Sequence, residues 1–343
     1  MRAFALTAPR EAAVVEVEPP IAAAGQVVVD VHRVGVCGTD VEFFTGEMAY
    51  LHQGHATYPM RLGHEWCGMV ASVGDGVDAG WVGRRVTGDT MLGCGLCDRC
   101  LDGRQHVCEQ RFEIGIRGGW PGTLAEQLLV PAVALRALPD SVDDVAGAMV
   151  EPGGNALRSV WGASLSPGKR VLIVGPGTIG LLCTQFALAS GAEVHVLGRS
   201  SKNLELARML GVHGTWTNDA LPELPWHAVI DATNGIEVPR RALDLVEPGG
   251  RLVLVGLAGE PSLIDTRTIA LKDVTVVGVL SASPALDETI QQFATGVDPK
   301  PLVAATVGLD QVADVLAGGR PSDAGSCPKI HIDPRRTLTK RPA

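Results

Sequence analysis

Four of the eight cysteines of the chain lie in one short stretch, GCGLCDRCLDGRQHVC, residues 93–108. Their spacing is Cys94-x2-Cys97-x2-Cys100-x7-Cys108. Tetrahedral zinc binds thiolates at about 2.3 Å, and short spacings with intervening glycines let one compact loop supply all four. Because four cysteines fill every coordination position, the predicted zinc ion is structural. The alternative is a redox C-x-x-C pair, which leaves the third and fourth thiols without a role.

A second set of possible metal ligands is dispersed along the chain. It consists of Cys37 in GVCGTD, His64 and Glu65 in LGHEWCG, and Glu151 in MVEPGG. A catalytic zinc ion takes three protein ligands from separate loops and keeps a fourth position for water or substrate. A lone Cys or His is more often a core residue than a ligand, so only the order and the neighbours of these residues favour a catalytic site. The remaining cysteines are predicted to be small buried apolar residues: Cys67, Cys183 and Cys327.

A glycine-rich turn predicts a dinucleotide site. In RVLIVGPGTIGLL an apolar strand is followed by Gly175-x-Gly177-x-x-Gly180 and then by a helix. The first glycine permits the tight turn, the second lets the backbone approach a pyrophosphate, and the third allows close helix packing. The N–H groups at the helix start attract phosphate. Thr178 and Ile179 lie inside this turn and are predicted to contact the cofactor as well.

The residues after the next strand favour NADP over NAD. An NAD site usually carries Asp or Glu about 20 residues beyond the glycines, which accepts hydrogen bonds from the ribose. Here EVHVLGRSSKN has no carboxylate after the strand. Arg199 is expected to bind a 2′-phosphate bidentately and Ser200 to donate to it. The alternative is that Arg199 and Lys202 are ordinary solvated residues.

The elements that must position these residues fall into two patterns. Residues 1–154 contain short β-branched runs separated by Gly and Pro, which predicts an irregular β-rich domain. Residues 155–285 alternate apolar strands such as RVLIVG and HAVIDAT with helical segments, which predicts a parallel sheet covered on both faces. After residue 286 this rhythm ends, and CPKIHIDP predicts a strand that returns to the first domain. The predicted fold class is therefore α/β with two domains, 1–154 plus 286–343 and 155–285.

Composition restricts the function classes. The 343 residues are 46% hydrophobic with a net charge of −9, which argues against nucleic acid as a partner. No secretory signal and no uninterrupted apolar stretch of about 18 residues is found, so we expect a cytoplasmic protein without a membrane span. Disulfides are rare in that compartment, which favours metal binding by the clustered cysteines.

The chain resembles the zinc-dependent medium-chain dehydrogenase/reductases, the alcohol, polyol and glucose dehydrogenase family, over nearly its whole length. GVCGTD, GHEWCG, the cysteine lobe, the EP before the second domain and VGPGTIG occur in that family's order. The resemblance implies a GroES-like catalytic domain and a Rossmann domain. It implies that Cys37 and His64 bind the catalytic zinc, with Glu65 and Glu151 as carboxylates that serve as third ligand or exchange with water. It also implies that Asp40 orients His64.

The same resemblance assigns roles around the metal. Thr39, two residues after the ligand cysteine, begins the proton relay, and Glu42 occupies a position where many relatives have histidine. Glu42 is therefore expected either to pass protons to water, to bind a substrate hydroxyl, or to be a solvated helix residue. Asn155 lies where relatives contact the nicotinamide. A glutamate at position 151 makes the chain resemble the sorbitol, threonine and glucose dehydrogenase branches of the family.

The predicted function is an oxidoreductase, an alcohol dehydrogenase with two zinc ions per chain that transfers a hydride between a secondary alcohol, polyol or sugar and NADP. The resemblance implies a homodimer or homotetramer. Three alternatives remain open: an NAD-dependent alcohol dehydrogenase of the same family, a zinc-independent enoyl or quinone reductase, and a non-catalytic zinc protein that senses NADPH. The zinc-independent reductases generally lack the cysteine lobe and the Cys/His ligands.

Overall fold

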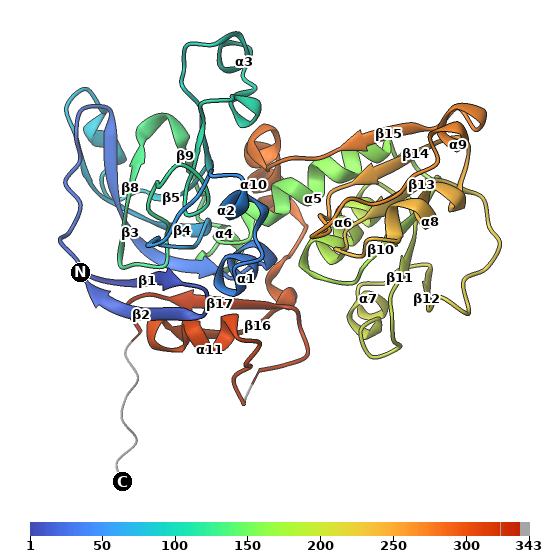
Figure 1. The fold of residues 1–343 in the computed structure, drawn as a ribbon. Helices are drawn as coiled ribbons and strands as arrows, with labels where there is room; N and C mark the ends of the chain where they lie inside the picture. Colours follow the sequence, from blue (N-terminus) through green and yellow to red (C-terminus); the bar gives the residue numbers. More distant parts are fainter. Residues whose placement is uncertain (323, 337–343) are drawn as a thin grey trace. The chain divides into compact units, whose positions relative to one another are not determined.

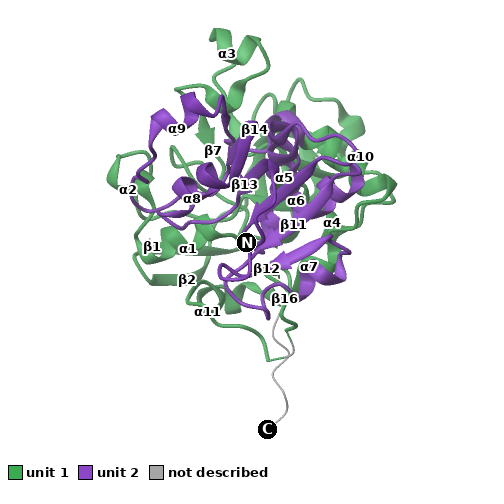
Figure 2. Cartoon of the chain, turned by 90° about the vertical axis from the view of Figure 1, so that its right-hand side faces the viewer, with its two compact units in different colours: residues 1–151, 286–343 green, residues 152–285 purple. Residues whose placement is uncertain are grey.

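The computed structural model describes residues 1–322 and 324–336. They belong to two compact units, one formed by residues 1–151 with 286 onward and one formed by residues 152–285 (Figures 1 and 2). These are unit 1 and unit 2, in that order. None of the described helices has the length and hydropathy needed to cross a bilayer.

Unit 1 is built on a mixed sheet with the strand order β16-β17-β3-β4-β5-β9, to which β8 adds by pairing with β3. The strands are β3 (Gln26–Gly35), β4 (Glu65–Val73), β5 (Arg85–Gly88), β8 (Gln127–Pro131), β9 (Leu135–Ala137), β16 (Val303–Gly308) and β17 (Lys329–Asp333). Alternating β-branched residues of β3, such as Val27, Val29 and Val31, are fully buried, and Trp66 packs in the same core. Val28 between them is buried as well, and this run of β-branched side chains explains why QVVVDV forms a strand.

Smaller elements surround this sheet in unit 1. Two two-stranded antiparallel sheets are formed by β1 (Arg2–Ala8) with β2 (Glu11–Glu16) and by β6 (Met91–Leu92) with β7 (Phe112–Glu113). The helices are α1 (Gly38–Thr45), α2 (Ala49–His52), α3 (Asp98–Leu101), α4 (Asp144–Gly147), α10 (Leu286–Thr295) and α11 (Val312–Leu316). The strand β17, near the end of the chain, runs antiparallel to β3, with His331 opposite Gly35. Residues near position 330 thereby lie beside residues near position 35.

Unit 2 is a six-stranded parallel sheet in the order β12-β11-β10-β13-β14-β15. The strands are β10 (Arg170–Val174), β11 (Glu193–Leu197), β12 (Gly214–Trp216), β13 (Trp226–Asp231), β14 (Val246–Leu254) and β15 (Thr275–Gly278). This is the doubly wound order in which the strand sequence reverses at the first strand, and dinucleotides bind at that reversal. The predicted α/β fold class with a doubly wound parallel sheet is confirmed.

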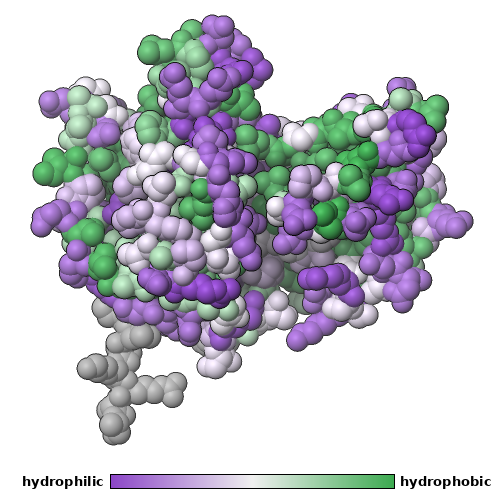
Figure 3. All heavy atoms as spheres, viewed as in Figure 1, coloured by the Kyte–Doolittle hydropathy of each residue, from purple (hydrophilic) through white to green (hydrophobic). Residues whose placement is uncertain are grey.

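The helices of unit 2 are α5 (Val150–Ala163), whose first residues belong to unit 1, α6 (Thr178–Ala189), α7 (Glu205–Met209), α8 (Val238–Leu245) and α9 (Thr266–Leu271). Leu172 and Ile173 of β10 are completely buried, as expected of a strand covered on both faces. In contrast, the outermost strand β15 exposes Val276, and Leu271 and Leu280 near it are exposed as well. Figure 3 shows hydrophobic residues on the surface over β15.

Candidate metal centres and cofactor loop

The first candidate site lies in unit 1, where the ends of β3 and β4 meet. Cys37 follows β3 and caps the start of α1, while His64 immediately precedes β4 and Glu65 begins it. The Cys37 Sγ and His64 Nε2 atoms are 3.2 Å apart. One ligand atom from each of Cys37, His64 and Glu65 can be chosen so that all three lie within 4.8 Å of one another. A thiolate, an imidazole and a carboxylate so close together match the ligand chemistry of zinc.

Asp40 ties together the two loops that carry these ligands. Its Oδ2 accepts a hydrogen bond from the Cys37 backbone N–H at 3.0 Å, and its Oδ1 accepts one from Gly63 at 3.2 Å. The His64 Nδ1 atom faces Oδ1 of Asp40 at 3.7 Å, which is an ion-pair distance and too long for a hydrogen bond. Asp40 is itself almost completely buried. Asp40 therefore fixes both loops and faces the ring of His64, the residue it is predicted to orient.

The electrostatics of this site favour a cation. Burial disfavours the charged imidazole, yet Cys37, Asp40 and Glu151 outweigh it and raise the pKa of His64 well above its usual value. Burial also raises the pKa of the Cys37 thiol; His64 opposes this effect and Asp40 adds to it. Cys37, Asp40 and Glu151 thus all favour a positive charge at the His64 ring. A divalent metal ion would take the place of the protons on Cys37 and His64, because both residues bind metal in their deprotonated forms.

The remaining residues predicted around this metal lie on two helices. Thr39 and Glu42 are partly buried, three positions apart on α1, and therefore lie on one side of it. Burial, with a smaller contribution from Glu47, raises the pKa of Glu42. Glu151 is a buried residue in the first turn of α5. Asn155 lies one turn later on α5, within unit 2, and its backbone carbonyl accepts a hydrogen bond from Ser159.

Lys329 is a residue of this site that the sequence analysis did not identify. It begins β17, its side chain is 2% exposed, and its Nζ lies 2.6 Å from Oε2 of Glu65. The available signal was a lysine at the start of the short strand KIHID. This signal does not indicate Glu65 as the partner, because the two residues are 264 positions apart in the sequence.

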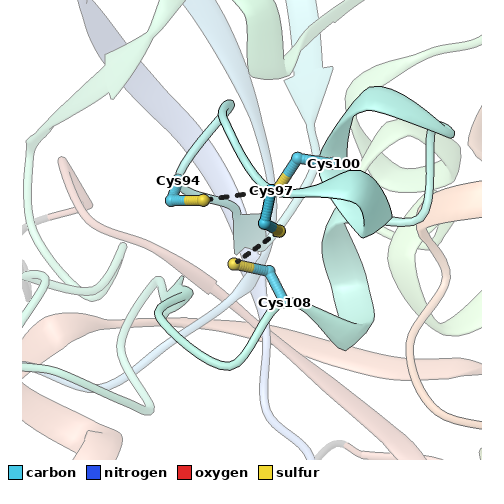
Figure 4. Close-up of side chains that lie close together, drawn as sticks. All are labelled: Cys94, Cys97, Cys100 and Cys108. Atoms are coloured by element: carbon cyan, nitrogen blue, oxygen red, sulfur yellow. Dashed lines mark hydrogen bonds between the residues drawn. The ribbon is translucent and has the colours of Figure 1, made fainter.

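The four clustered cysteines also come together, in a lobe around α3 (Figure 4). The Sγ atoms of Cys94 and Cys100 are 3.9 Å apart and those of Cys97 and Cys108 are 3.8 Å apart. Four thiolates around a tetrahedral zinc ion are separated by about 3.8 Å, since each Zn–S bond is about 2.3 Å. A disulfide would require about 2.05 Å. The four thiols therefore fit a closed zinc site.

The thiols of this lobe differ in pKa, since burial raises the pKa of Cys100 to about 12. Backbone N–H groups of Leu96 and Cys97 lower the pKa of Cys94 to about 6, which favours the thiolate that zinc requires.

Of the three cysteines predicted to be buried, Cys67 and Cys183 are buried. The prediction for Cys327 is wrong, because this residue is partly exposed in the segment before β17.

The glycine-rich turn of unit 2 joins β10 to α6. Gly175 has a φ of +100°, and a Cβ there would lie 2.7 Å from the Thr233 methyl group. A Cβ on Gly180 would lie 1.9 Å from the Gly175 carbonyl oxygen, so the start of α6 packs directly on the turn. Gly177, in contrast, has no atom within 4 Å of its Cβ position and leaves open space at the helix N-terminus. Thr178 and Ile179 form the first residues of α6 and are partly buried.

The residue after β11, where the NAD-specific carboxylate is absent, is Gly198. It is buried, and a Cβ there would lie 2.9 Å from the Leu204 side chain. The next two residues, Arg199 and Ser200, are exposed. They follow the C-terminal end of β11, which is the edge of the sheet where the glycine-rich turn also lies. Gly198 itself carries no carboxylate that would repel a phosphate group.

Comparisons with known proteins place both parts of the chain among dehydrogenases. The chain matches the family "Alcohol dehydrogenase GroES-like domain" over residues 23–140 and the family "Zinc-binding dehydrogenase" over residues 178–295. An L-threonine 3-dehydrogenase from Idiomarina loihiensis is 30% identical over 312 residues, which cover 86% of this chain and 89% of that protein. Two solved structures also cover 97% of this chain and 99% of their own. One is a short chain alcohol dehydrogenase from Escherichia coli complexed with NADH, with TM-score 0.88 and 27% identity. The other is a zinc-binding dehydrogenase from Sinorhizobium meliloti bound to NADP, with TM-score 0.87 and 29% identity.

Proposed function

This chain belongs to the zinc-type medium-chain dehydrogenase/reductase family, and from that premise we propose that it is a zinc-dependent, NADP-dependent alcohol dehydrogenase. An oxidoreductase is the class that the family supports. The proposed reaction transfers a hydride between NADP(H) and a secondary alcohol, a polyol or a sugar. The observation that carries the proposal is the cluster of the partly buried Cys37 with the buried His64 and Glu65.

The ligand residues have distinct tasks in this proposal. Cys37 and His64 would hold the ion together with Glu151 or Glu65, and Asp40 would keep both ligand loops in place through its two backbone hydrogen bonds. When bound, zinc lowers the pKa of a coordinated alcohol, so that the substrate can lose its proton and then transfer a hydride.

The proton released by the substrate needs a route to water. The Thr39 hydroxyl lies on the first turn of α1, next to the ligand Cys37. Glu42 lies one turn further along the same side, and its raised pKa brings it closer to the range in which a carboxyl group exchanges protons near neutral pH. We therefore assign the relay to Thr39 followed by Glu42.

The cofactor preference rests on the residues that follow β11. Arg199 would pair with a 2′-phosphate, and Ser200 would donate a hydrogen bond to it. The open space at Gly177 would accept the pyrophosphate, with Gly175, Thr178, Ile179 and Gly180 shaping the turn, and Asn155 would contact the nicotinamide. Two relatives of about equal identity to this chain are bound to NADH in one structure and to NADP in the other. The proposed preference for NADP therefore depends on this chain's own residues.

The experiment combines activity with metal content. Purified protein is assayed by nicotinamide absorbance against a panel of secondary alcohols, polyols and sugars, with NADP and with NAD. Replacing Cys37 by Ser or His64 by Ala should lower kcat/KM by at least about 100-fold, because several kcal/mol of electrophilic stabilisation are lost. Zinc should fall from two ions per chain to one. The matched control is Cys327→Ser, which changes a partly exposed cysteine outside both clusters.

Each alternative predicts a different metal result. Full turnover in Cys37→Ser or His64→Ala would refute the proposal, as would a larger kcat/KM with NAD for its cofactor preference. One zinc ion per chain, in the cysteine lobe, with no turnover would support the NADPH-sensing alternative. A chain that turns over substrate without bound zinc would instead be a zinc-independent reductase.

A further inference from the structure

The feature of unit 2 that the proposed reaction leaves unexplained is the segment that follows β15. Ser281 in this segment has a φ of +70°, although it is not a glycine, and it is 7% exposed. A left-handed backbone at a residue with a side chain costs energy, and it persists only where the surrounding structure enforces it. Conformations of this kind are found at functional sites more often than elsewhere.

Arg158 of α5 is the residue that holds this conformation. Its Nη1 atom donates to the backbone carbonyls of two consecutive residues, Leu280 and Ser281, the latter at 2.6 Å. Consecutive carbonyls of an extended strand point in opposite directions, so these two converge on one nitrogen only because the backbone turns between them. The guanidinium remains charged near neutral pH, although burial lowers its pKa. Arg158 is therefore a permanent donor to both carbonyls.

Further contacts fix the 280–283 segment on the same helix. The Ser281 Oγ atom lies 2.8 Å from Ser283 Oγ and accepts a hydrogen bond from the Ser283 backbone N–H at 3.1 Å. A Cβ on Gly154 would lie 2.6 Å from the Cβ of Ala282, so the first turns of α5 pack directly on the segment. Ala282 and both serines are at most 7% exposed. The segment is therefore held by close packing as well as by hydrogen bonds.

The 280–283 segment leaves the sheet at the edge where the dinucleotide is expected. Four parallel strands, β10, β13, β14 and β15, end in one row, because their last residues pair in register: Val174, Asp231, Leu254 and Gly278. The glycine-rich turn follows the first of these ends and the 280–283 segment follows the last. The doubly wound fold binds one nucleotide on each half of its sheet. Since Arg199 after β11 is assigned to the adenosine, the half formed by β13, β14 and β15 is left for the nicotinamide.

We propose that Arg158 is a positioning residue for hydride transfer: by holding the 280–283 segment, it fixes the surface against which the nicotinamide lies. This inference rests on the proposed function, because it requires a nicotinamide cofactor in unit 2. Asn155, which is assigned to the nicotinamide, lies three residues before Arg158 on α5, so both act from one side of the helix. A shift of about 1 Å in a reacting group is enough to slow a reaction strongly. Loosening the segment should therefore affect the nicotinamide half of the cofactor and spare the adenosine half.

The test compares cofactors with and without the nicotinamide. Arg158→Met removes both hydrogen bonds and keeps a long unbranched side chain. Calorimetric titration should show NADPH binding about tenfold weaker, while the affinity for 2′-phospho-ADP-ribose, which lacks the nicotinamide, should change by less than about twofold. The kcat with NADP should fall by about tenfold or more.

The matched control is Arg251→Met. Arg251 also donates to a backbone carbonyl of α5, that of Gly162 at 3.2 Å, but it pairs with Thr275, the first residue of β15, and so lies at the opposite edge of the sheet. This variant should keep the parent affinity for both ligands and the parent kcat. The same selective loss in Arg251→Met as in Arg158→Met would overturn the inference.

A second variant changes the segment and leaves Arg158 in place. Ser281→Val puts a β-branched residue at a positive φ, which such residues avoid, and should give the same selective loss. It replaces Arg158→Met if that protein does not fold. A folded variant that loses affinity equally for both ligands, or that keeps the parent affinities and kcat, overturns the inference. NADH and ADP-ribose give the same comparison in a chain that prefers NAD. A parent protein that binds none of these four ligands refutes the proposed function instead.

Discussion

Arg199 is the residue on which the cofactor preference depends. It is exposed directly after β11, next to a glycine that has no room for a carboxylate side chain. A charge-assisted hydrogen bond to phosphate contributes about 1.5–3 kcal/mol. We therefore expect Arg199→Ala to lower kcat/KM for NADP by about 10- to 100-fold and to leave the value for NAD unchanged. Steady-state kinetics with both cofactors measures this, and an equal loss for both would contradict the assignment.

Glu42 gives a prediction that depends on pH. Burial and Glu47 raise its pKa in the folded protein, so folding favours the protonated form. A raised carboxyl pKa contributes stability below the unfolded value, and this contribution is lost as pH rises through the folded value. At pH 7 the ionised Glu42 therefore costs stability. Urea unfolding should show Glu42→Gln to be more stable than the parent at pH 7, with a difference that disappears below about pH 4.

A matched substitution tests that explanation. Glu18 is exposed, so Glu18→Gln measures what the same chemical change does at the surface. An equal gain in Glu18→Gln and Glu42→Gln would show that burial is not the cause. A separate loss of turnover in Glu42→Gln would support its place in the proton relay.

At this scale the sequence predicts ligand types better than ligand partners. Cys37, His64 and Glu65 stand in short motifs that mark them as possible ligands, and β3 and β4 bring them together. Lys329 is missed because its role depends on a strand pairing between β17 and β3, which no local pattern specifies. The long separation in sequence, and not the chemistry of the lysine, hides it.

Among the elements, the turn between β10 and α6 offers a comparison of two glycines. A Cβ on Gly180 would overlap a backbone oxygen, whereas a Cβ on Gly177 would meet open space. Gly180→Ala should therefore destabilise the protein by about 1–3 kcal/mol, as overpacking of a backbone contact does. Gly177→Ala should leave stability unchanged but weaken NADP binding, because the methyl group enters the space for the pyrophosphate. Urea unfolding and cofactor titration distinguish the two, and similar stabilities would contradict this account.

The cysteine lobe is an element whose stability we attribute to metal. Leu96 and Leu101 of the lobe are exposed, so they contribute little apolar burial, whereas a structural zinc ion contributes directly to folding. Cys97→Ser should lose one zinc ion per chain and unfold at a lower temperature, while the zinc at Cys37 is retained. Metal analysis and thermal unfolding check this against Cys327→Ser. A Cys97→Ser protein with unchanged zinc and stability would contradict a metal site in the lobe.

The strand patterns explain why the elements themselves were predictable. Fully apolar runs such as Val171–Ile173 are buried on both faces, which only a covered parallel sheet provides. The irregular β-rich part is harder, because β5, β6, β7 and β9 span two to four residues each. Such short strands have no periodicity of their own, and their pairing is decided by the longer strands beside them.

At the scale of the whole molecule, the edge strand β15 favours assembly with a second chain. The outer edge of β15 pairs with no other strand among the described residues. Val276 on this strand is 38% exposed, and Leu271 and Leu280 beside it are 87% and 39% exposed. An unpaired edge with apolar neighbours favours pairing with another chain. A twofold axis would let β15 pair with its own copy and extend the sheet across two chains.

We therefore expect a homodimer that forms through β15. Val276→Lys places a charge on this edge, as natural proteins do to prevent pairing, and should raise the dimer dissociation constant by at least about tenfold. The matched control is Thr215→Lys on β12, at the opposite edge of the same sheet, which should leave the dimer intact. Sedimentation velocity over a range of concentrations measures both. A parent chain that sediments as a monomer at micromolar concentration, or equal weakening by both variants, would contradict assembly through this strand.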